Sequence, residues 1–376
     1  MQTIKSGTFK PTSPMMAPRA FHTATLLANG DVLVVGGLNA DAATAMAPQS
    51  VRVEALLPGG MSLDQQAYAS SVERYDPNQQ KWSSAAPLHG ARWSHTALLL
   101  RSGLVMVTGG SDGTTLRSSE LYDVPSNRWF ASADLKIPRF AHTATLLPSG
   151  EVLVVGGNNL QPSGGEVLDS VERFDPATGQ WADMPSLPVA RMNHTATLLD
   201  TGELLVAGGY SATDNAALRS ACIFDPQRRL WREIEPMPTP RMLQTATLLE
   251  DGSVLLAGGA DAPFGLPLNS GVLYCPNDGT WQPTTALTVA RSRHTATRLN
   301  SGEVLVAGST GVFDIGDARS AEIYNPASNE WVPVGDLSDG RHSHSATLLK
   351  SGAVLIAGGQ IPTPDPGYTG SAELFS

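Results

Sequence analysis

The sequence is poor in cysteine, in charge and in long apolar runs, and each shortage excludes a class of protein. Its 376 residues include only 2 cysteines, Cys222 and Cys275, which occupy different positions of the repeat described below. We therefore expect buried thiols rather than a disulfide. Charged residues make up 16% of the chain and the net charge is -10, which argues against nucleic-acid binding. No apolar run approaches the length of a membrane span, so no membrane contact is expected.

The N-terminal segment, residues 1–19, lacks the apolar stretch of a signal peptide. If Met1 is the natural start, we predict a cytoplasmic protein, and if a signal peptide has been removed, a secreted one. Of the 25 basic residues, 20 are arginine. Arginine suits planar contact with carboxylate or phosphate groups.

One unit recurs seven times, with the pattern Arg-x-x-His-Thr-Ala-Thr-Leu-Leu-x-x-Gly-x-Val-Leu-Val-x-Gly-Gly. The copies begin at Arg19, Arg92, Arg139, Arg191, Arg241, Arg291 and Arg341. Each continues into a Ser-x-x-x-Tyr/Phe segment, with Glu at its third position in five copies, and a Trp follows in six copies. A fixed period near 50 residues indicates a closed array of similar units. We therefore predict a single domain over residues 1–376.

The third copy predicts a blade of four short strands. Small residues open the strand at 142–147, an apolar run at 151–155 is typical of a strand buried on both faces, 170–174 alternates, and Trp181 opens the outermost strand. The seventh copy stops before its fourth strand, whereas Phe9 lies ten residues before Arg19, where other copies have Trp. The sequence therefore predicts an all-β, seven-bladed β-propeller of four-stranded antiparallel blades, whose N-terminal strand completes the last blade and closes the ring.

The double glycines and the aromatic residues that follow them resemble the Kelch-repeat family of β-propellers. Six copies carry this mark, at Gly36-Gly37, Gly109-Gly110, Gly156-Gly157, Gly208-Gly209, Gly258-Gly259 and Gly358-Gly359, and the sixth repeat departs from it with Gly308-Ser309. The resemblance covers nearly the whole chain and implies the fold. It does not imply one function, because related propellers act as peptide-binding adaptors, carbohydrate enzymes and copper oxidases.

The length of the repeat varies only in the segment between the double glycine and the following Ser. Seven residues separate Gly110 from Ser118, but 33 separate Gly37 from Ser71. Variable loops on a rigid scaffold usually carry binding, so we expect this face to be the working face. The insertion at 38–70 is predicted to form a lid or a contact with a protein partner or a second copy. Its predicted contact residues are Arg52, Glu54, Gln65 and Tyr68.

The seven repeated arginines are expected on the same face, as a positive ring around a central funnel. In peptide-binding Kelch adaptors, arginine at this position reaches ligand carboxylates. The alternative is that each arginine pairs with a glutamate of its own repeat, at Glu73, Glu120, Glu172, Glu322 and Glu373. The fourth and fifth repeats have Cys222 and Val272 there, so Arg191, Arg241 and Arg291 are the predicted anion contacts, because one or two of them lose a partner.

The positions after each arginine break the repeat. Large side chains in the first five repeats (Phe21, Trp93, Phe140, Met192 and Met242) and Arg293 in the sixth predict a funnel with one apolar and one basic wall. Such a funnel suits an anionic or amphipathic small molecule, or an acidic peptide. The alternative is that the aromatic residues fill gaps between blades.

Histidine opens six of the seven first strands, and Gln244 replaces the seventh. We expect hydrogen bonds at blade junctions from these residues, with no metal and no cofactor. No phosphate loop, zinc spacing, hydrolase triad or Tyr–Cys copper constellation is recognisable in the sequence. His342 lies outside the repeat, near Arg293, and is the predicted catalytic acid–base residue.

Three functions follow from these patterns. The first is a binding module for an anionic ligand in the funnel, in which Gln244 and Tyr68 also contact the ligand. The second is a stand-alone acid–base enzyme of the isomerase, epimerase or cyclase type. The third is a protein–protein interaction scaffold.

Overall fold

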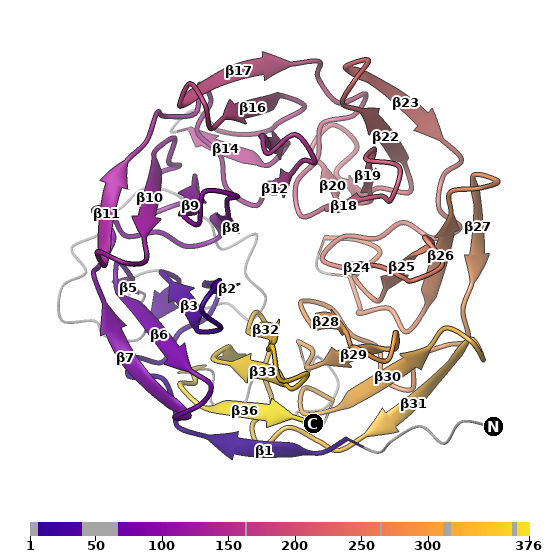
Figure 1. Ribbon diagram of the computed structural model, residues 1–376. Helices are drawn as coiled ribbons and strands as arrows, with labels where there is room; N and C mark the ends of the chain where they lie inside the picture. Colours follow the sequence, from indigo (N-terminus) through magenta and orange to yellow (C-terminus); the bar gives the residue numbers. More distant parts are fainter. Residues whose placement is uncertain (1–6, 40–66, 162–163, 264, 311–316, 363–366) are drawn as a thin grey trace.

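The computed structural model describes residues 7–39, 67–161, 164–263, 265–310, 317–362 and 367–376. In these residues the strands form seven four-stranded antiparallel sheets around a central axis (Figure 1). The predicted all-β, seven-bladed propeller is therefore confirmed. No helix of the described part is long and apolar enough to cross a membrane.

Each blade runs from an innermost to an outermost strand. The strands of blades 1 to 4, in that order, are β2 (Thr23–Leu26), β3 (Val32–Val35), β6 (Val72–Asp76) and β7 (Lys81–Ala85); β8 (Thr96–Leu99), β9 (Val105–Thr108), β10 (Ser119–Asp123) and β11 (Arg128–Ala131); β12 (Thr143–Leu146), β13 (Val152–Val155), β16 (Val171–Asp175) and β17 (Gln180–Met184); and β18 (Thr195–Leu198), β19 (Leu204–Ala207), β22 (Ala221–Asp225) and β23 (Leu230–Ile234).

Blades 5 to 7 follow the same plan, and the N-terminal strand supplies the last position. Their strands are β24 (Thr245–Leu248), β25 (Val254–Ala257), β26 (Gly271–Cys275) and β27 (Thr280–Pro283); β28 (Thr295–Arg298), β29 (Val304–Ala307), β30 (Ala321–Asn325) and β31 (Glu330–Val334); and β32 (Ser345–Leu348), β33 (Val354–Ala357), β36 (Ala372–Phe375) and β1 (Phe9–Thr12).

The ring closes where β1 pairs with β36, with Phe9 opposite Phe375. The centroids of these two aromatic side chains lie 5.0 Å apart, and the ring centroids of Tyr75 and Trp82 in blade 1 have the same separation. Phe9 thus takes the place that Trp holds elsewhere, as predicted. This pairing covers the edge of β36, which would otherwise be open.

Short hairpins extend four blades beyond the double glycines. They are β4 (Leu38–Asn39) with β5 (Ala67–Tyr68), β14 (Asn158–Gln161) with β15 (Gly164–Val167), β20 (Tyr210–Ser211) with β21 (Ala216–Ala217), and β34 (Gln360–Ile361) with β35 (Gly367–Tyr368). The first hairpin is formed by the two ends of the 38–70 insertion. Residues 40–66, with Arg52, Glu54 and Gln65, lie outside the described residues.

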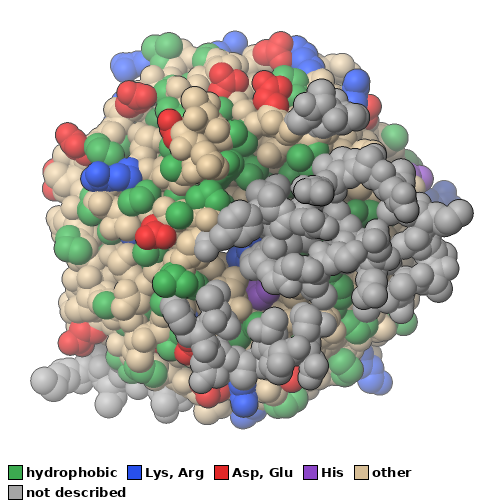
Figure 2. Space-filling view, turned by 180° about the vertical axis from the view of Figure 1, so that it is seen from behind, with side chains coloured by type: hydrophobic (Ala, Val, Ile, Leu, Met, Phe, Trp, Pro, Cys, Tyr) green, Lys and Arg blue, Asp and Glu red, His purple; other side chains and the backbone are tan. Residues whose placement is uncertain are grey.

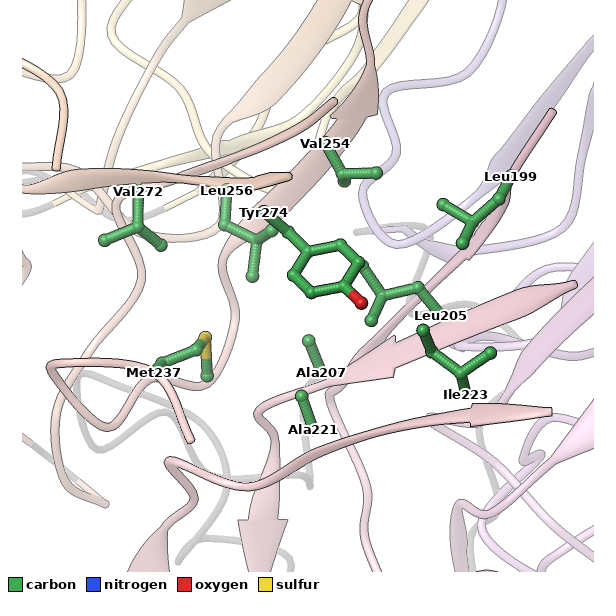
Figure 3. Packing of buried hydrophobic residues seen from close by; sticks show 10 residues of the cluster. All are labelled: Leu199, Leu205, Ala207, Ala221, Ile223, Met237, Val254, Leu256, Val272 and Tyr274. Carbon is green, nitrogen blue, oxygen red and sulfur yellow. The ribbon is translucent and has the colours of Figure 1, made fainter. Parts of the chain in front are cut away.

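The core lies between neighbouring blades. The second strand of every blade is fully buried, and its side chains pack against the adjacent blade on either side. Between blades 4 and 5 the ring of Tyr274 lies in the middle of a ten-residue apolar cluster (Figure 3). Val272 belongs to this cluster, at the strand position where five other blades carry glutamate.

Candidate ligand-binding site

The seven repeated arginines are buried inside the blades, with at most 1% of each exposed. In blade 3, Nη1 of Arg139 donates to the carbonyl oxygens of Gly156 (2.8 Å) and Ser170 (3.0 Å), and Nη2 donates to the Glu172 carboxylate (2.8 Å). The other blades repeat the bonds to the two carbonyls. The arginines fasten the connections between blades, which corrects the expectation that they rim the funnel.

The expected pairing with glutamate is confirmed in five blades. Those ion pairs have N···O distances of 2.6–3.1 Å. Arg291 is one of them, bound to Glu322 at 2.6 Å. Arg191 and Arg241 face Cys222 and Val272 instead, and they bond only to backbone carbonyls and a serine hydroxyl. Burial lowers the pKa of Arg241 to about 10.

A proline explains why these two blades lack the glutamate. In the other five blades the residue three positions before the arginine donates its N–H to the glutamate, as Lys136 does to Glu172 at 2.7 Å. Blades 4 and 5 have Pro188 and Pro238 at that position, and proline has no N–H to donate. The glutamate and the N–H that would bind it are therefore absent together. We infer that these two blades differ in their internal hydrogen bonds, and that the missing glutamate does not indicate an anion site.

This difference predicts unequal costs for the same substitution in two blades. Arg139→Met leaves Glu172 buried without a counter-charge and is expected to cost about 3–5 kcal/mol. Arg241→Met removes only bonds to neutral acceptors and is expected to cost about 1–3 kcal/mol. Urea unfolding of both variants measures the two values. Equal losses would contradict the assignment of the ion pair as the stronger anchor.

Seven residues with a left-handed backbone surround the axis, one from each blade and each two positions after the repeated arginine. We call them the left-handed ring: Phe21, Ser94, Ala141, Asn193, Leu243, Arg293 and Ser343, with φ between 51° and 58°. Each N–H donates to the carbonyl of the preceding blade's member at 2.9–3.3 Å, and the circle closes from Phe21 to Ser343. Backbone bonds therefore fix the seven positions and leave their side chains free to differ. Nothing in the sequence signals this ring, because Phe, Leu and Arg rarely adopt positive φ.

A second ring, the histidine ring, lies beside it and consists of His22, His95, His142, His194, Gln244, His294 and His344. Each histidine Nε2 pairs with a Thr or Ser hydroxyl of the preceding blade at 2.8–3.0 Å, which confirms the predicted junction bonds. Gln244 donates to the Ala207 carbonyl instead. Burial lowers the pKa of His22 and His194 to about 3, and the pKa values of the other four histidines well below 6.5. The ring is therefore neutral at pH 7.

The two rings surround an open cavity of about 360 Å³ on the propeller axis. All fourteen ring members line it, together with Trp93 and Phe140. Four residues predicted for the site thus meet here: Trp93, Phe140, Gln244 and Arg293. The others lie elsewhere and do not line this cavity: Arg191, Arg241, Arg291, Met192, Met242, Tyr68 and His342. Met192 and Met242 are buried where their backbones bridge to Tyr210 and Ala260, and Tyr68 packs in an apolar cluster with Leu38 and Trp93.

The cavity has an apolar side and a charged side. The ring centroids of Phe21 and Trp93 lie 5.5 Å apart, and those of Trp93 and Phe140 lie 6.0 Å apart, so blades 1 to 3 form a continuous aromatic arc. Arg293 of blade 6 places its Cζ 5.5 Å from the Phe21 ring centroid, a cation–π distance. Burial lowers the pKa of Arg293 to about 10, which keeps it charged at pH 7. Figure 2, the view from behind, shows some basic and histidine surface near the middle of the face, whereas most other Lys and Arg lie toward its edge, as most Asp and Glu do.

The structure places the predicted catalytic residue, His342, outside the cavity. Only 4% of it is exposed, and its Nδ1 lies 3.0 Å from the Ser343 hydroxyl. Burial, with the charge of Arg293, lowers the pKa of His342 to about 3. An acid–base catalyst needs a pKa near the working pH, so His342 is not suited to this role at neutral pH. Within the described residues, no group of three or more His, Cys, Asp or Glu is placed to hold a metal ion.

Comparison with known proteins identifies a family and shows similar folds among solved structures. The model of the KLHDC2/KLHL20/DRC7 Kelch-repeats domain matches residues 45–259 and 141–359. No curated protein matches the chain. Among solved structures, a fungal alcohol oxidase of the AA5 family, in complex with copper, is similar with a TM-score of 0.78 and 15% identity, over 99% of this chain and 76% of that one. At this identity the likeness shows the fold alone.

Proposed function

Because this chain belongs to the Kelch-repeat family of β-propellers, a fold that supports binding or scaffold roles, we propose that it is a binding protein whose axial cavity holds a small anionic, amphipathic molecule. One observation carries the proposal: Arg293 and the aromatic arc of blades 1 to 3 line the same open cavity. Aromatic side chains beside a few placed polar groups are typical of ligand sites.

The size of the cavity favours a small molecule over an acidic peptide. Its volume of about 360 Å³ lies at the lower end of the range for ligand pockets, about 300–1,000 Å³. A peptide would place little more than one residue inside. The predicted partner is therefore an anionic small molecule.

The protonation states of the cavity support binding over acid–base catalysis. Its six histidines have pKa values far below 7, because burial disfavours their charged form, and Arg293 remains a cation. None of these groups changes its charge near neutral pH, as a general acid or base does.

A thermal-shift screen of carboxylates, sugar acids and phosphates tests the proposed function. A ligand at about 100 times its Kd stabilises the native state by about 2.7 kcal/mol, so we expect amphipathic carboxylates to raise the melting temperature. Neutral analogues of the same shape serve as controls. If no anion in the screen stabilises the protein, the proposed function is wrong.

A further inference from the structure

The backbone around the cavity is already used in hydrogen bonds. Every N–H and carbonyl that links the left-handed ring is bonded within the circle. The histidine Nε2 atoms are likewise bonded to hydroxyls of the preceding blade. The left-handed ring therefore offers no cluster of spare backbone donors of the kind that cradles phosphate groups. Recognition of an anion at this ring must come from side chains.

The side chains of the described lining carry one formal charge. Of the sixteen described residues around the cavity, Arg293 is the one Arg, Lys, Asp or Glu. The histidines are neutral for the reason given above. A guanidinium presents donors in a planar fork that matches a carboxylate. The cavity thus has one strong anion contact, on blade 6.

The rest of the wall is divided by blade. Phe21, Trp93 and Phe140 form the aromatic arc of blades 1 to 3, and the amides Asn193 and Gln244 come from blades 4 and 5. Phe21 both begins the arc and carries Arg293 over its ring. Charge and aromatic side chains are therefore adjacent. Trp93 and Phe140 are only 6% and 3% exposed, so Phe21 is the most accessible of the three rings.

We propose that the ligand is a monoanion built on a flat apolar ring, with its carboxylate at Arg293 and its ring against the arc of Phe21, Trp93 and Phe140. This inference rests on the proposed function and names its ligand class. A second negative charge would lose its hydration without a second cation to pair with it. A neutral analogue would forgo the charge-assisted hydrogen bond.

Calorimetric titrations of the full chain with four probe compounds measure separately what the first charge, a second charge and the apolar ring contribute to binding. The probes are 2-naphthoate, neutral 2-naphthalenemethanol, the dianion 2,6-naphthalenedicarboxylate, and acetate, which lacks the ring. We expect 2-naphthoate to bind at least about 10-fold more tightly than each of the others. Equal or tighter binding of the dianion would overturn the inference.

Two variants of blade 6 locate the charge contact. Arg293→Gln is expected to weaken 2-naphthoate binding roughly 10- to 100-fold and to change binding of 2-naphthalenemethanol by less than about 3-fold. The matched control is Arg298→Gln, an exposed arginine at the end of β28 that lies outside the cavity lining, and it should bind like the wild type. Circular dichroism confirms that each variant is folded.

The outcomes distinguish the inference from the function on which it rests. If other anions bind but 2-naphthoate does not, or if Arg293→Gln binds 2-naphthoate normally, the ligand class is wrong and a binding function stands. If neither these probes nor the screened anions bind, both are wrong. Loss of 2-naphthoate binding in Arg293→Gln alone supports the inference.

Discussion

The Glu172→Val variant should lose about 3–5 kcal/mol of its free energy of unfolding, because it leaves a buried charge unpaired. Glu172 is 1% exposed and binds Arg139 at 2.8 Å. Its carboxylate also accepts the N–H groups of Lys136 (2.7 Å) and Ile137 (3.2 Å). Valine removes all three bonds. Urea unfolding at pH 7 gives the loss directly.

Adding Lys136→Pro to Glu172→Val recreates the pair of residues found in blade 5, Pro238 and Val272. The proline removes one N–H that the valine leaves without an acceptor. The double variant should therefore lose at least about 1 kcal/mol less than the sum of the two single losses. Additive losses would show that proline and glutamate are unrelated, and would reopen Arg191 and Arg241 as anion contacts.

Acid should destabilise the protein steeply, starting below pH 6.5. Burial depresses the pKa values of His22, His194 and His342 to about 3 in the folded state, whereas an unfolded chain titrates near the ordinary 6.5. Between these values the unfolded state binds protons that the native state does not. Stability is therefore complete above pH 6.5 and falls as the pH falls toward 3, by up to about 1.4 kcal/mol per pH unit for each histidine. The urea midpoint between pH 7 and pH 4.5 measures this slope.

His194→Gln is the matched control for this pH dependence, because Gln244 already occupies the equivalent position in blade 5 and is 7% exposed. The variant binds one proton fewer on acid unfolding. Its stability should fall less steeply, by about 1.4 kcal/mol per pH unit. An unchanged slope would mean that His194 does not titrate in the way described.

The fold was predictable because the same signals occur seven times. In blade 3 the strand expected at 142–147 spans Thr143–Leu146, and the one expected at 151–155 spans Val152–Val155. If a strand is misplaced in one repeat, comparison with the other six repeats corrects its position. The N-terminal strand that completes the seventh blade could also be predicted. Phe9 has the same spacing from Arg19 that each Trp has from the next arginine.

The site was predicted less well because repeat position does not tell which way a side chain points. The arginines look like a funnel rim in sequence, yet their bonding partners lie inside the blade. The proline at 188 and 238 was a visible sign that the missing glutamates belong to the scaffold. Two residues follow each arginine. In six blades the first of them forms a backbone bridge with the residue after the double glycine, as His342 does with Gln360. The second lines the cavity. Trp93 and Phe140, at the first position, are large enough to line it as well.

The most direct test compares the shift in melting temperature that 2-naphthoate produces in Arg241→Met and in Arg293→Gln. The structure assigns the repeated arginine to the scaffold and the non-repeated one to the cavity. Arg241→Met should melt at a lower temperature but keep the ligand-induced shift, whereas Arg293→Gln should lose most of the shift. A shift that is lost in Arg241→Met and kept in Arg293→Gln would contradict this assignment.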